Sequence, residues 1–304
     1  MRFSSAPRTE QCNASLIHVM KILINPEYEY LRPFVEKLTH PIFFTRHGTT
    51  LHDGRNRIKL FEADRVKLVV KSYERLSLFN RFVYGSLRKS KAMRAYRHAG
   101  RLRRLGIDTP EEVAVVEIRH RGMMQRCYFV SLYTDYESIR PATELFMRRD
   151  EAESVLDGVA EFLVRMHWAG VEHKDLNIGN ILYKNERMNG SDRYRFLVID
   201  TNRMQFRRSL SMRRRLRNMR RLSCRTPAYL YILHRYAELL HTDADGVQLK
   251  GVVYRLVFEW KRRTKRKIKS IFRRNEAARL LLPLLILTAG NVRMLVSFLF
   301  PIGL

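Results

Sequence analysis

The chain has 304 residues, which is enough for two lobes with a hydrophobic core in each. Its hydrophobic content of 45% is ordinary for a globular protein and excludes bulk disorder. The formal charge of +28 implies an anionic partner, either nucleic acid, acidic membrane lipid or a phosphorylated substrate. Cys12, Cys127 and Cys224 form no Cys-x-x-Cys pair, so a reducing cytosolic setting fits better than a zinc site or a disulfide framework.

The N-terminal region divides at Met20. Residues 1–19 contain no apolar run of the kind found in signal peptides, whereas Met20 opens the strand-like sequence Met-Lys-Ile-Leu-Ile. We expect residues 1–19 to be a disordered extension, or residues that precede the true start. A first lobe is then predicted for residues 20–135.

Two short runs in this lobe predict a β-hairpin. Residues 57–62 and 66–73 are β-branched or alternating, and a short polar turn separates them. Lys71, near the end of the second run, could reach the phosphates of a nucleotide. The preceding loop contains Gly54 and Arg55, and its backbone amides and positive charge could cover the same phosphates.

A basic helix and two further strands complete the first lobe. The helix is predicted over residues 90–105, and the strands over Val113–Ile118 and Cys127–Tyr133. The second strand would lead into a hinge, where Leu132 and Tyr133 would contact the nucleotide. The expected lobe is therefore a small antiparallel sheet with one helix.

The second predicted lobe, residues 136–260, is mostly helical. From Asp150 onward, apolar residues recur at helical spacing, which indicates a buried helix that leads to His173. Three further helices are predicted over Arg203–Arg225, Tyr229–His241 and Val252–Arg274.

Residues His173 to Asn180 have the spacing H-x-D-x-x-x-x-N, which is typical of a phosphotransferase catalytic loop. In such a loop, Asp175 would accept a proton from the attacking hydroxyl or orient that hydroxyl. Asn180 would hold a magnesium ion, and His173 would brace the loop backbone. Chance supplies these three positions in about one chain of this size in thirty, so neighbouring features have to support them.

Two other features lie where the same chemistry requires them. The apolar run Phe196–Ile199 leads into Asp200, which would be the second magnesium ligand at the end of a strand. Together with Lys71 upstream, this order favours a site for ATP and Mg²⁺. The alternative treats Lys71 as a solvated strand end and Asp200 as a helix cap. Asp175 and Asn180 would then be turn formers.

The chain resembles the bacterial lipopolysaccharide kinase family, the 3-deoxy-D-manno-octulosonic acid (Kdo) and heptose kinases. These enzymes are distant relatives of eukaryotic protein kinases and of the Rio group. The resemblance spans roughly residues 20 to 260 and implies an α+β, protein-kinase-like fold with two lobes. The segments that carry it are Gly54–Lys59, Val69–Lys71, Ser90–Ala92, Gly106–Pro110, His173–Asn180 and Ile199–Met204.

The resemblance also implies an activity and a location. The γ-phosphate of ATP would pass, with Mg²⁺, to a sugar hydroxyl of the lipopolysaccharide core or of a Kdo–lipid A acceptor. The enzyme would lie peripherally on the cytoplasmic face of the bacterial inner membrane. Two alternatives remain open, namely a non-catalytic or weakly active nucleotide-binding protein at the membrane and a Rio-type protein kinase. The oligomeric state is not predicted.

One expected residue is missing. A kinase lysine is normally aimed by a glutamate on the helix of the first lobe, yet no Asp or Glu occurs from Arg75 to Ile107. Lys71 therefore needs another partner, such as Glu62 across the hairpin, or is oriented by the nucleotide alone.

Two polybasic segments account for much of the charge. Arg207–Arg221 has eight arginines and Lys261–Arg274 has nine basic residues, and neither contains an acid. A solvated face is the ordinary explanation, but such segments attract anionic leaflets by about 1 kcal/mol per basic residue, and lipid A phosphates likewise. Nucleic acid is the rival partner, although we find no nucleic-acid-binding signature and expect no specific binding.

The last predicted unit, residues 261–304, joins a polybasic segment to an apolar tail. The tail over residues 280–304 is interrupted by Pro283, Gly290 and Arg293, so it favours an interfacial anchor over a membrane span. A frameshifted end is the alternative.

Overall fold

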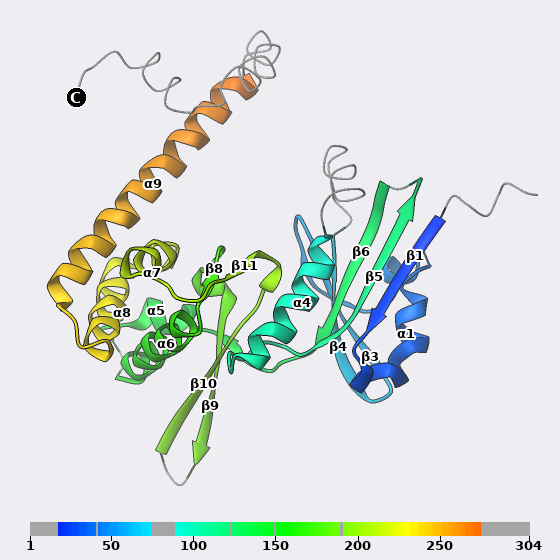
Figure 1. Cartoon of the computed structure of the whole chain (residues 1–304), viewed down its shortest axis with the longest axis horizontal. Helices are drawn as coiled ribbons and strands as arrows, with labels where there is room; N and C mark the ends of the chain where they lie inside the picture. The colour runs from blue at the N-terminus through cyan, green and yellow to red at the C-terminus, as the bar shows by residue number, and fades with distance from the viewer. Residues whose placement is uncertain are drawn as a thin grey trace, which may run out of the picture.

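The computed structural model describes residues 18–40, 42–73, 89–121, 123–148, 150–188 and 191–274. The chain forms two lobes, and the long helix α9 extends away from the second lobe (Figure 1). Residues 1–17 of the predicted extension and the apolar tail lie outside the described residues, whereas His18 and Val19, expected to be disordered, belong to the first strand.

The first lobe is built on a six-stranded antiparallel sheet in the order β1-β5-β6-β4-β3-β2. Its strands are β1 His18–Ile24, β2 Thr49–Asp53, β3 Arg57–Ala63, β4 Val66–Ser72, β5 Glu112–His120 and β6 Met123–Leu132. Its helices are η1 Pro26–Leu31, α1 Arg32–Lys37, α2 Phe43–Arg46 and α4 Lys91–Arg104. The predicted strand at Met20 begins at His18.

The sheet of the first lobe is covered on both faces. Val116 of β5 packs with Phe34 and Phe44 from α1 and α2, whereas the adjacent Val115 packs with Ala92 and Met93 from α4. Because successive side chains of a strand point to opposite faces, a strand covered on both sides needs a continuous apolar run. The run at Val113–Ile118 therefore marks a central strand.

The predicted hairpin and basic helix are confirmed. Asp64 and Arg65 both have positive φ, +48° and +64°, so a two-residue turn joins β3 to β4. Ser90 caps α4 by accepting a hydrogen bond from the Met93 amide at 2.9 Å. The helix ends just before Gly106, whose φ is +70°.

The second lobe is mostly helical, with three small groups of strands. Its helices are α5 Arg140–Leu145, α6 Asp150–Trp168, η2 Ile178–Asn180, η3 Thr201–Arg203, α7 Met212–Met219, α8 Thr226–Leu239 and α9 Ala244–Arg274. Its strands are β7 Glu137–Ser138, β8 Val171–His173, β9 Ile181–Met188, β10 Ser191–Val198 and β11 Met204–Phe206. Helix α6 is central to the core and packs against α8, as the buried period from Asp150 predicted.

Two features of this lobe differ from the prediction. The helix expected over Arg203–Arg225 is wrong, because Met204 pairs with His173 in the β11–β8 ladder and the helix begins only at Met212. The strand expected at Phe196 is one arm of the β9–β10 hairpin, whose first arm was not predicted. Met204 lies in a strand because it pairs with the distant strand β8, and the polar segment before β10 lies in a strand because it pairs with β10. In both cases strand pairing overrides the local sequence pattern.

The two lobes are joined through the end of β10. The Val198 amide donates to the carbonyl of Asp108 at 3.0 Å, and the Thr109 hydroxyl donates to the carbonyl of Val198 at 2.7 Å. These bonds attach the segment after α4 to the strand that leads into Asp200. No helix in the described part of the chain is long and apolar enough to span a bilayer.

Substitution of Gly170, in the turn between α6 and β8, tests how rigidly the chain before the catalytic loop is positioned. Gly170 has φ +71°, and a Cβ there would lie 1.9 Å from the carbonyl oxygen of Arg207. Gly106 has a similar φ of +70° but open space around it. Gly106→Ala should therefore cost only the conformational penalty, about 1–2 kcal/mol. Gly170→Ala should cost a further 1–3 kcal/mol, roughly, from overpacking.

Urea denaturation of the two variants measures this difference. Equal losses of unfolding free energy would show that the turn between α6 and β8 yields to the extra methyl group and does not position the loop rigidly.

Candidate active site

A cavity of about 260 Å³ lies between the two lobes. Leu132 and Tyr133 line it from the connection between lobes, and Lys71 and Asp200 line it from the two facing lobes. Its remaining walls are largely apolar and come from Leu51, Ile58, Val69, Thr109, Pro110, Phe129, Ser131, Thr134, Leu182, Ile199 and Thr201.

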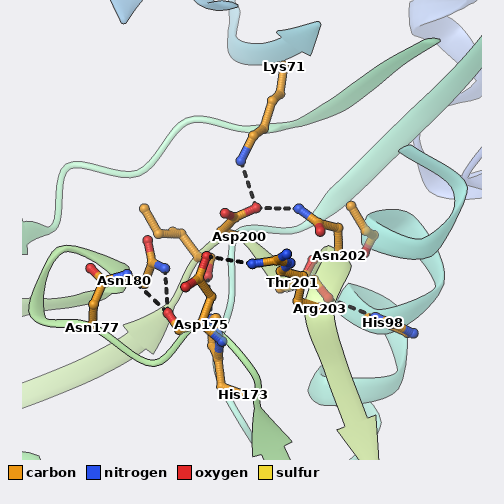
Figure 2. Close-up of polar contacts among 12 residues, drawn as sticks. Lys71, His98, His173, Asp175, Asn177, Asn180, Asp200, Thr201, Asn202 and Arg203 are labelled. Carbon is orange, nitrogen blue, oxygen red and sulfur yellow. Dashed lines mark hydrogen bonds and ion pairs between the residues drawn. The ribbon is translucent and has the colours of Figure 1, made fainter. Parts of the chain in front are cut away.

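An ion pair crosses this cavity. The ammonium group of Lys71 donates to Oδ1 of Asp200 at 2.8 Å, and the two side chains are only 16% and 23% exposed (Figure 2). Burial alone would raise the pKa of the Asp200 carboxyl, but the charge and hydrogen bond of Lys71 outweigh it and hold that pKa below its ordinary value. Asp200 is therefore ionised throughout the neutral range.

The backbone at Asp200 turns sharply, and helix α4 holds the turn. Asp200 has φ +60°, an uncommon left-handed conformation for a residue other than glycine. The Thr201 hydroxyl donates to the carbonyl of Ala95 at 3.0 Å, and Nδ1 of His98 donates to the carbonyl of Thr201 at 2.7 Å. Ala95 and His98, two of the α4 positions where a glutamate is expected, therefore anchor the Asp200 turn.

The catalytic loop is a network of amide hydrogen bonds around Asp175. Asn180 and Asn177 both donate through Nδ2 to the backbone carbonyl of Asp175, at 2.8 and 3.0 Å. The Gly179 amide in turn donates to Oδ1 of Asn177 at 2.9 Å. These bonds hold Asp175 and Asn180 on one tight turn.

His173 lies fully buried beneath the loop and ties it to the strand before Asp200. Its Nδ1 accepts from the Asp175 amide at 3.1 Å, and its Nε2 donates to the carbonyl of Ile199 at 3.0 Å. Burial lowers the pKa of His173, which favours the neutral ring that these two bonds require. His173 thus braces the backbone of the loop, and its buried ring is not placed to contact a substrate hydroxyl.

The carboxylate of Asp175 faces Arg203. Nη1 of Arg203 lies 3.4 Å from Oδ2 of Asp175, and both side chains are substantially exposed (Figure 2). An exposed pair of this kind contributes little to stability. Asp175 is therefore accessible to a hydroxyl that approaches from solvent.

Asn180 and Asp200 fit a magnesium ion. The Ile199 amide donates to the carbonyl of Asn180 at 3.0 Å, which keeps the loop beside the Asp200 turn. Amide and carboxylate oxygens are ligands that Mg²⁺ accepts, and this ion normally keeps waters and substrate phosphates as its other ligands. Among the described residues, no group of three or more His, Cys, Asp or Glu could hold a metal by itself, so a phosphate-assisted site is the one that these residues suit.

Two predictions for the nucleotide side need correction. Glu62 is not the partner of Lys71, because the hairpin register pairs Glu62 with Lys67 and Lys71 with Ile58. Gly54 and Arg55 lie at the tip of the β2–β3 hairpin and do not line the cavity, which Leu51 and Ile58 of the same hairpin line instead.

Lys91 is a second lysine beside the ring of Tyr73 that the sequence did not reveal. Its ammonium group lies 5.8 Å from the centre of the Tyr73 ring, and that of Lys71 lies 5.7 Å from the same centre. Burial lowers the pKa of Lys91, and nearby arginines, first among them Arg55, lower it further. The available signal was its position at the start of an acid-free helix.

A buried polar network supports the loop from below. Asn218 donates through Nδ2 to the carbonyl of His173 at 2.7 Å, and its Oδ1 lies 3.2 Å from Nε2 of His167. The other ring nitrogen of His167 is 2.8 Å from the hydroxyl of Tyr236. This network connects α6, α7 and α8 to the catalytic loop.

Comparison with known proteins identifies the family. The family model described as "Lipopolysaccharide kinase (Kdo/WaaP) family" matches residues 45–230, more than half of the chain. The chain belongs to this family. The resemblance inferred from the sequence is thus confirmed, and phosphotransferase activity is the general activity that this kinase family supports. No curated protein matches the chain.

A solved structure supports the fold. A structure titled "WaaP in complex with acyl carrier protein" is 18% identical, with a TM-score of 0.53, and the match covers 81% of this chain and 98% of that one. This likeness confirms the two-lobed kinase-like fold. The Rio2 kinase of Chaetomium thermophilum, solved as an ADP/Mg²⁺–phosphoaspartate complex, is 16% identical, with a TM-score of 0.42 and coverage of 75% and 67%.

The buried histidine of the supporting network predicts an acid-sensitive fold. Burial lowers the pKa of His167 to about 4 from an ordinary 6.5. The folded state therefore binds fewer protons than the unfolded state below about pH 6.5. The stability that the neutral ring contributes is full above this pH and is lost as the pH falls towards 4, by up to about 3 kcal/mol.

Urea denaturation at about pH 7 and pH 4.5 measures this loss. His167→Gln, which cannot titrate, should show a smaller drop in unfolding free energy than the wild type. His234→Gln, at a partly exposed histidine on the surface of α8, should behave like the wild type. An identical drop in the wild type and His167→Gln would contradict the assignment.

Proposed function

We propose that this protein transfers the γ-phosphoryl group of ATP to a hydroxyl of Kdo or heptose in the inner core of lipopolysaccharide. The observation that carries the proposal is the Lys71–Asp200 pair in the interlobe cavity, beside the Asp175 loop, in a chain of the lipopolysaccharide kinase family. Neither a lone lysine nor a lone aspartate would support it.

Each residue would have a separate task. Lys71 would bind the α- and β-phosphates, and Asp175 would accept the proton of the sugar hydroxyl. The hydroxyl oxygen would form a bond to the γ-phosphorus while the bond between the γ-phosphorus and the bridging β-phosphate oxygen breaks. The products are ADP and a sugar phosphate. Asn180 and Asp200 would hold Mg²⁺, which supplies charge neutralisation when bound.

The missing glutamate does not leave Lys71 without a partner. Asp200 itself holds the ammonium group, and α4 holds Asp200 through His98 and Ala95. A weakly active nucleotide-binding protein remains the alternative, because Asp200 would have to serve both the lysine and the metal ion.

Transfer of labelled phosphate from ATP to Kdo–lipid A tests the proposal. Asp175→Ala should lower the rate about 10²- to 10⁴-fold, since general-base catalysis contributes about that much. Glu161→Ala should leave the rate unchanged, because Glu161 is an exposed carboxylate on α6, away from the loop.

The destination of the label separates the alternatives. Nucleotide binding without transfer to any acceptor would indicate a non-catalytic protein, and label on protein alone would indicate a Rio-type kinase. Mass spectrometry of the product identifies the sugar and the hydroxyl.

We further propose that the protein binds peripherally to the cytoplasmic face of the bacterial inner membrane through α9. One face of α9 packs on the second lobe, where Val247 is buried and Arg255 donates to the carbonyl of Cys224 at 2.6 Å. The outer face carries an exposed apolar stripe, Leu249, Val253, Leu256, Val257 and Trp260, each between 42% and 67% exposed.

The charge of α9 favours an anionic bilayer as the partner of this stripe. The polybasic segment Lys261–Arg274 continues the same helix directly after Trp260, and the helix leads away from the body of the protein (Figure 1). An apolar stripe joined to basic residues is the pattern of an interfacial helix.

Sedimentation with liposomes tests this surface. Binding to vesicles with phosphatidylglycerol should exceed binding to neutral vesicles, and the double variant Leu256→Ser/Trp260→Ser should bind several-fold more weakly. Met147→Ser is the control, because Met147 is 78% exposed but lies outside α9. A double variant that binds normally, yet no longer self-associates, would show that a second copy covers the stripe.

A further inference from the structure

A second, smaller cavity of about 120 Å³ lies beside the catalytic loop, on a different side from the nucleotide cavity. It shares no lining residue with the interlobe cavity. Strand β8, the loop after it, and α7 with the turn that follows contribute its walls: Glu172, Lys174, Arg214, Arg217, Arg220 and Arg221. Since a water molecule takes about 30 Å³ in the liquid, the cavity has room for one phosphate or carboxylate group.

The cavity contains far more positive than negative charge. Five cations face the single carboxylate of Glu172, which already pairs with Lys174 and lies 3.7 Å from Arg207. Within the described part of the chain, none of the four arginines forms an ion pair with an acid. Nε of Arg220 is buried and has no hydrogen-bond partner there. A buried donor without a partner is costly, and a bound anion would supply an acceptor for Nε of Arg220; Oε2 of Glu172 in the same wall is likewise buried without a hydrogen-bond partner.

Two of the four arginines, Arg220 and Arg221, are held in place and are not part of a freely solvated face. The guanidinium groups of Arg220 and Arg221 stack on the ring of Phe258 in α9, at 4.9 and 5.0 Å. Burial and then neighbouring cations lower the pKa of Arg220, so positive charge is concentrated where water is scarce. Solvated surface arginines would show neither the fixed stacking nor this shift.

The cavity adjoins the catalytic base. Lys174 directly precedes Asp175, and its backbone amide donates to the carbonyl of Arg203, the residue that contacts the Asp175 carboxylate. Burial lowers the pKa of Arg221, and the charge of Asp175 opposes that shift, which places the two groups within electrostatic reach. A ligand held in the cavity would therefore lie close to Asp175 without entering the nucleotide cavity.

We propose that Lys174, Arg214, Arg217, Arg220 and Arg221 form an acceptor-anion site, which binds a phosphate or carboxylate group of the acceptor and so brings the acceptor hydroxyl to Asp175. This inference rests on the proposed function, since it assigns the acceptor side of the same reaction. Arginine suits the task, because its planar fork binds either group through two parallel hydrogen bonds.

Kinetics with two arginine variants test the site. Arg214→Gln/Arg217→Gln removes two exposed lining arginines and should raise the KM for Kdo–lipid A about tenfold or more, while the KM for ATP and kcat stay near the wild-type values. Arg213→Gln is the matched control, because Arg213 is exposed on the same helix but does not line the cavity. An unchanged KM for the acceptor, or a loss confined to kcat, would overturn the proposal.

Two modified acceptors distinguish the source of the anion. If the site binds the Kdo carboxylate, the double variant and the wild type should have the same KM for carboxyl-reduced Kdo–lipid A. If it binds a lipid A phosphate, the two proteins should converge on dephosphorylated acceptor. A tenfold difference that persists with both modified acceptors would overturn the assignment.

A binding measurement separates this inference from the proposed function. With the nucleotide cavity saturated by a non-hydrolysable ATP analogue, inorganic phosphate at millimolar concentration should raise the melting temperature of the wild type and of Arg213→Gln, but not of the double variant. Equal shifts in all three proteins would overturn the site. Absence of phosphoryl transfer in the wild type would overturn the proposed function, and this phosphate measurement would still decide whether the anion site exists.

Discussion

The ion pair between Lys71 and Asp200 is the constraint on which the active-site geometry depends. The two residues are 129 positions apart, come from different lobes and are largely withdrawn from water. Removal of one partner from such a pair leaves an uncompensated charge, at a cost of about 3–5 kcal/mol. The pair therefore favours one arrangement of the lobes and positions the lysine at the same time.

The residues next to Asp200 connect this ion pair to the rest of the site through hydrogen bonds. Ile199 binds His173 under the catalytic loop, Thr201 binds α4, and Arg203 binds Asp175. Helix α4 thus acts on Lys71 indirectly, by holding the carboxylate that holds the lysine. A helix without acids can serve this purpose, because backbone carbonyls, a hydroxyl and a neutral imidazole supply the anchoring bonds.

In the function that we propose, the excess positive charge lies at three places, each with its own anionic ligand. Lys71 lines the nucleotide cavity, the arginines of α7 and of the turn after it surround the cavity that we assign to the acceptor, and the basic end of α9 continues beyond the apolar stripe. All three places would meet anions, namely nucleotide phosphates, the acceptor and lipid headgroups. Because the nucleotide, the acceptor and the lipid surface would all be anionic, a high positive net charge would assist association with each of them. The charge therefore does not require nucleic acid as a partner.

The sequence by itself determined the fold class, the β3–β4 hairpin and the spacing of the catalytic loop. These features depend on local periodicity, turn chemistry and short motifs. Only the tertiary structure decided the partner of Lys71, the role of α4, the short strand β11 and the arginine cavity. Those features depend on contacts between residues far apart in the chain, and no local pattern specifies which distant carboxylate or strand a segment will meet.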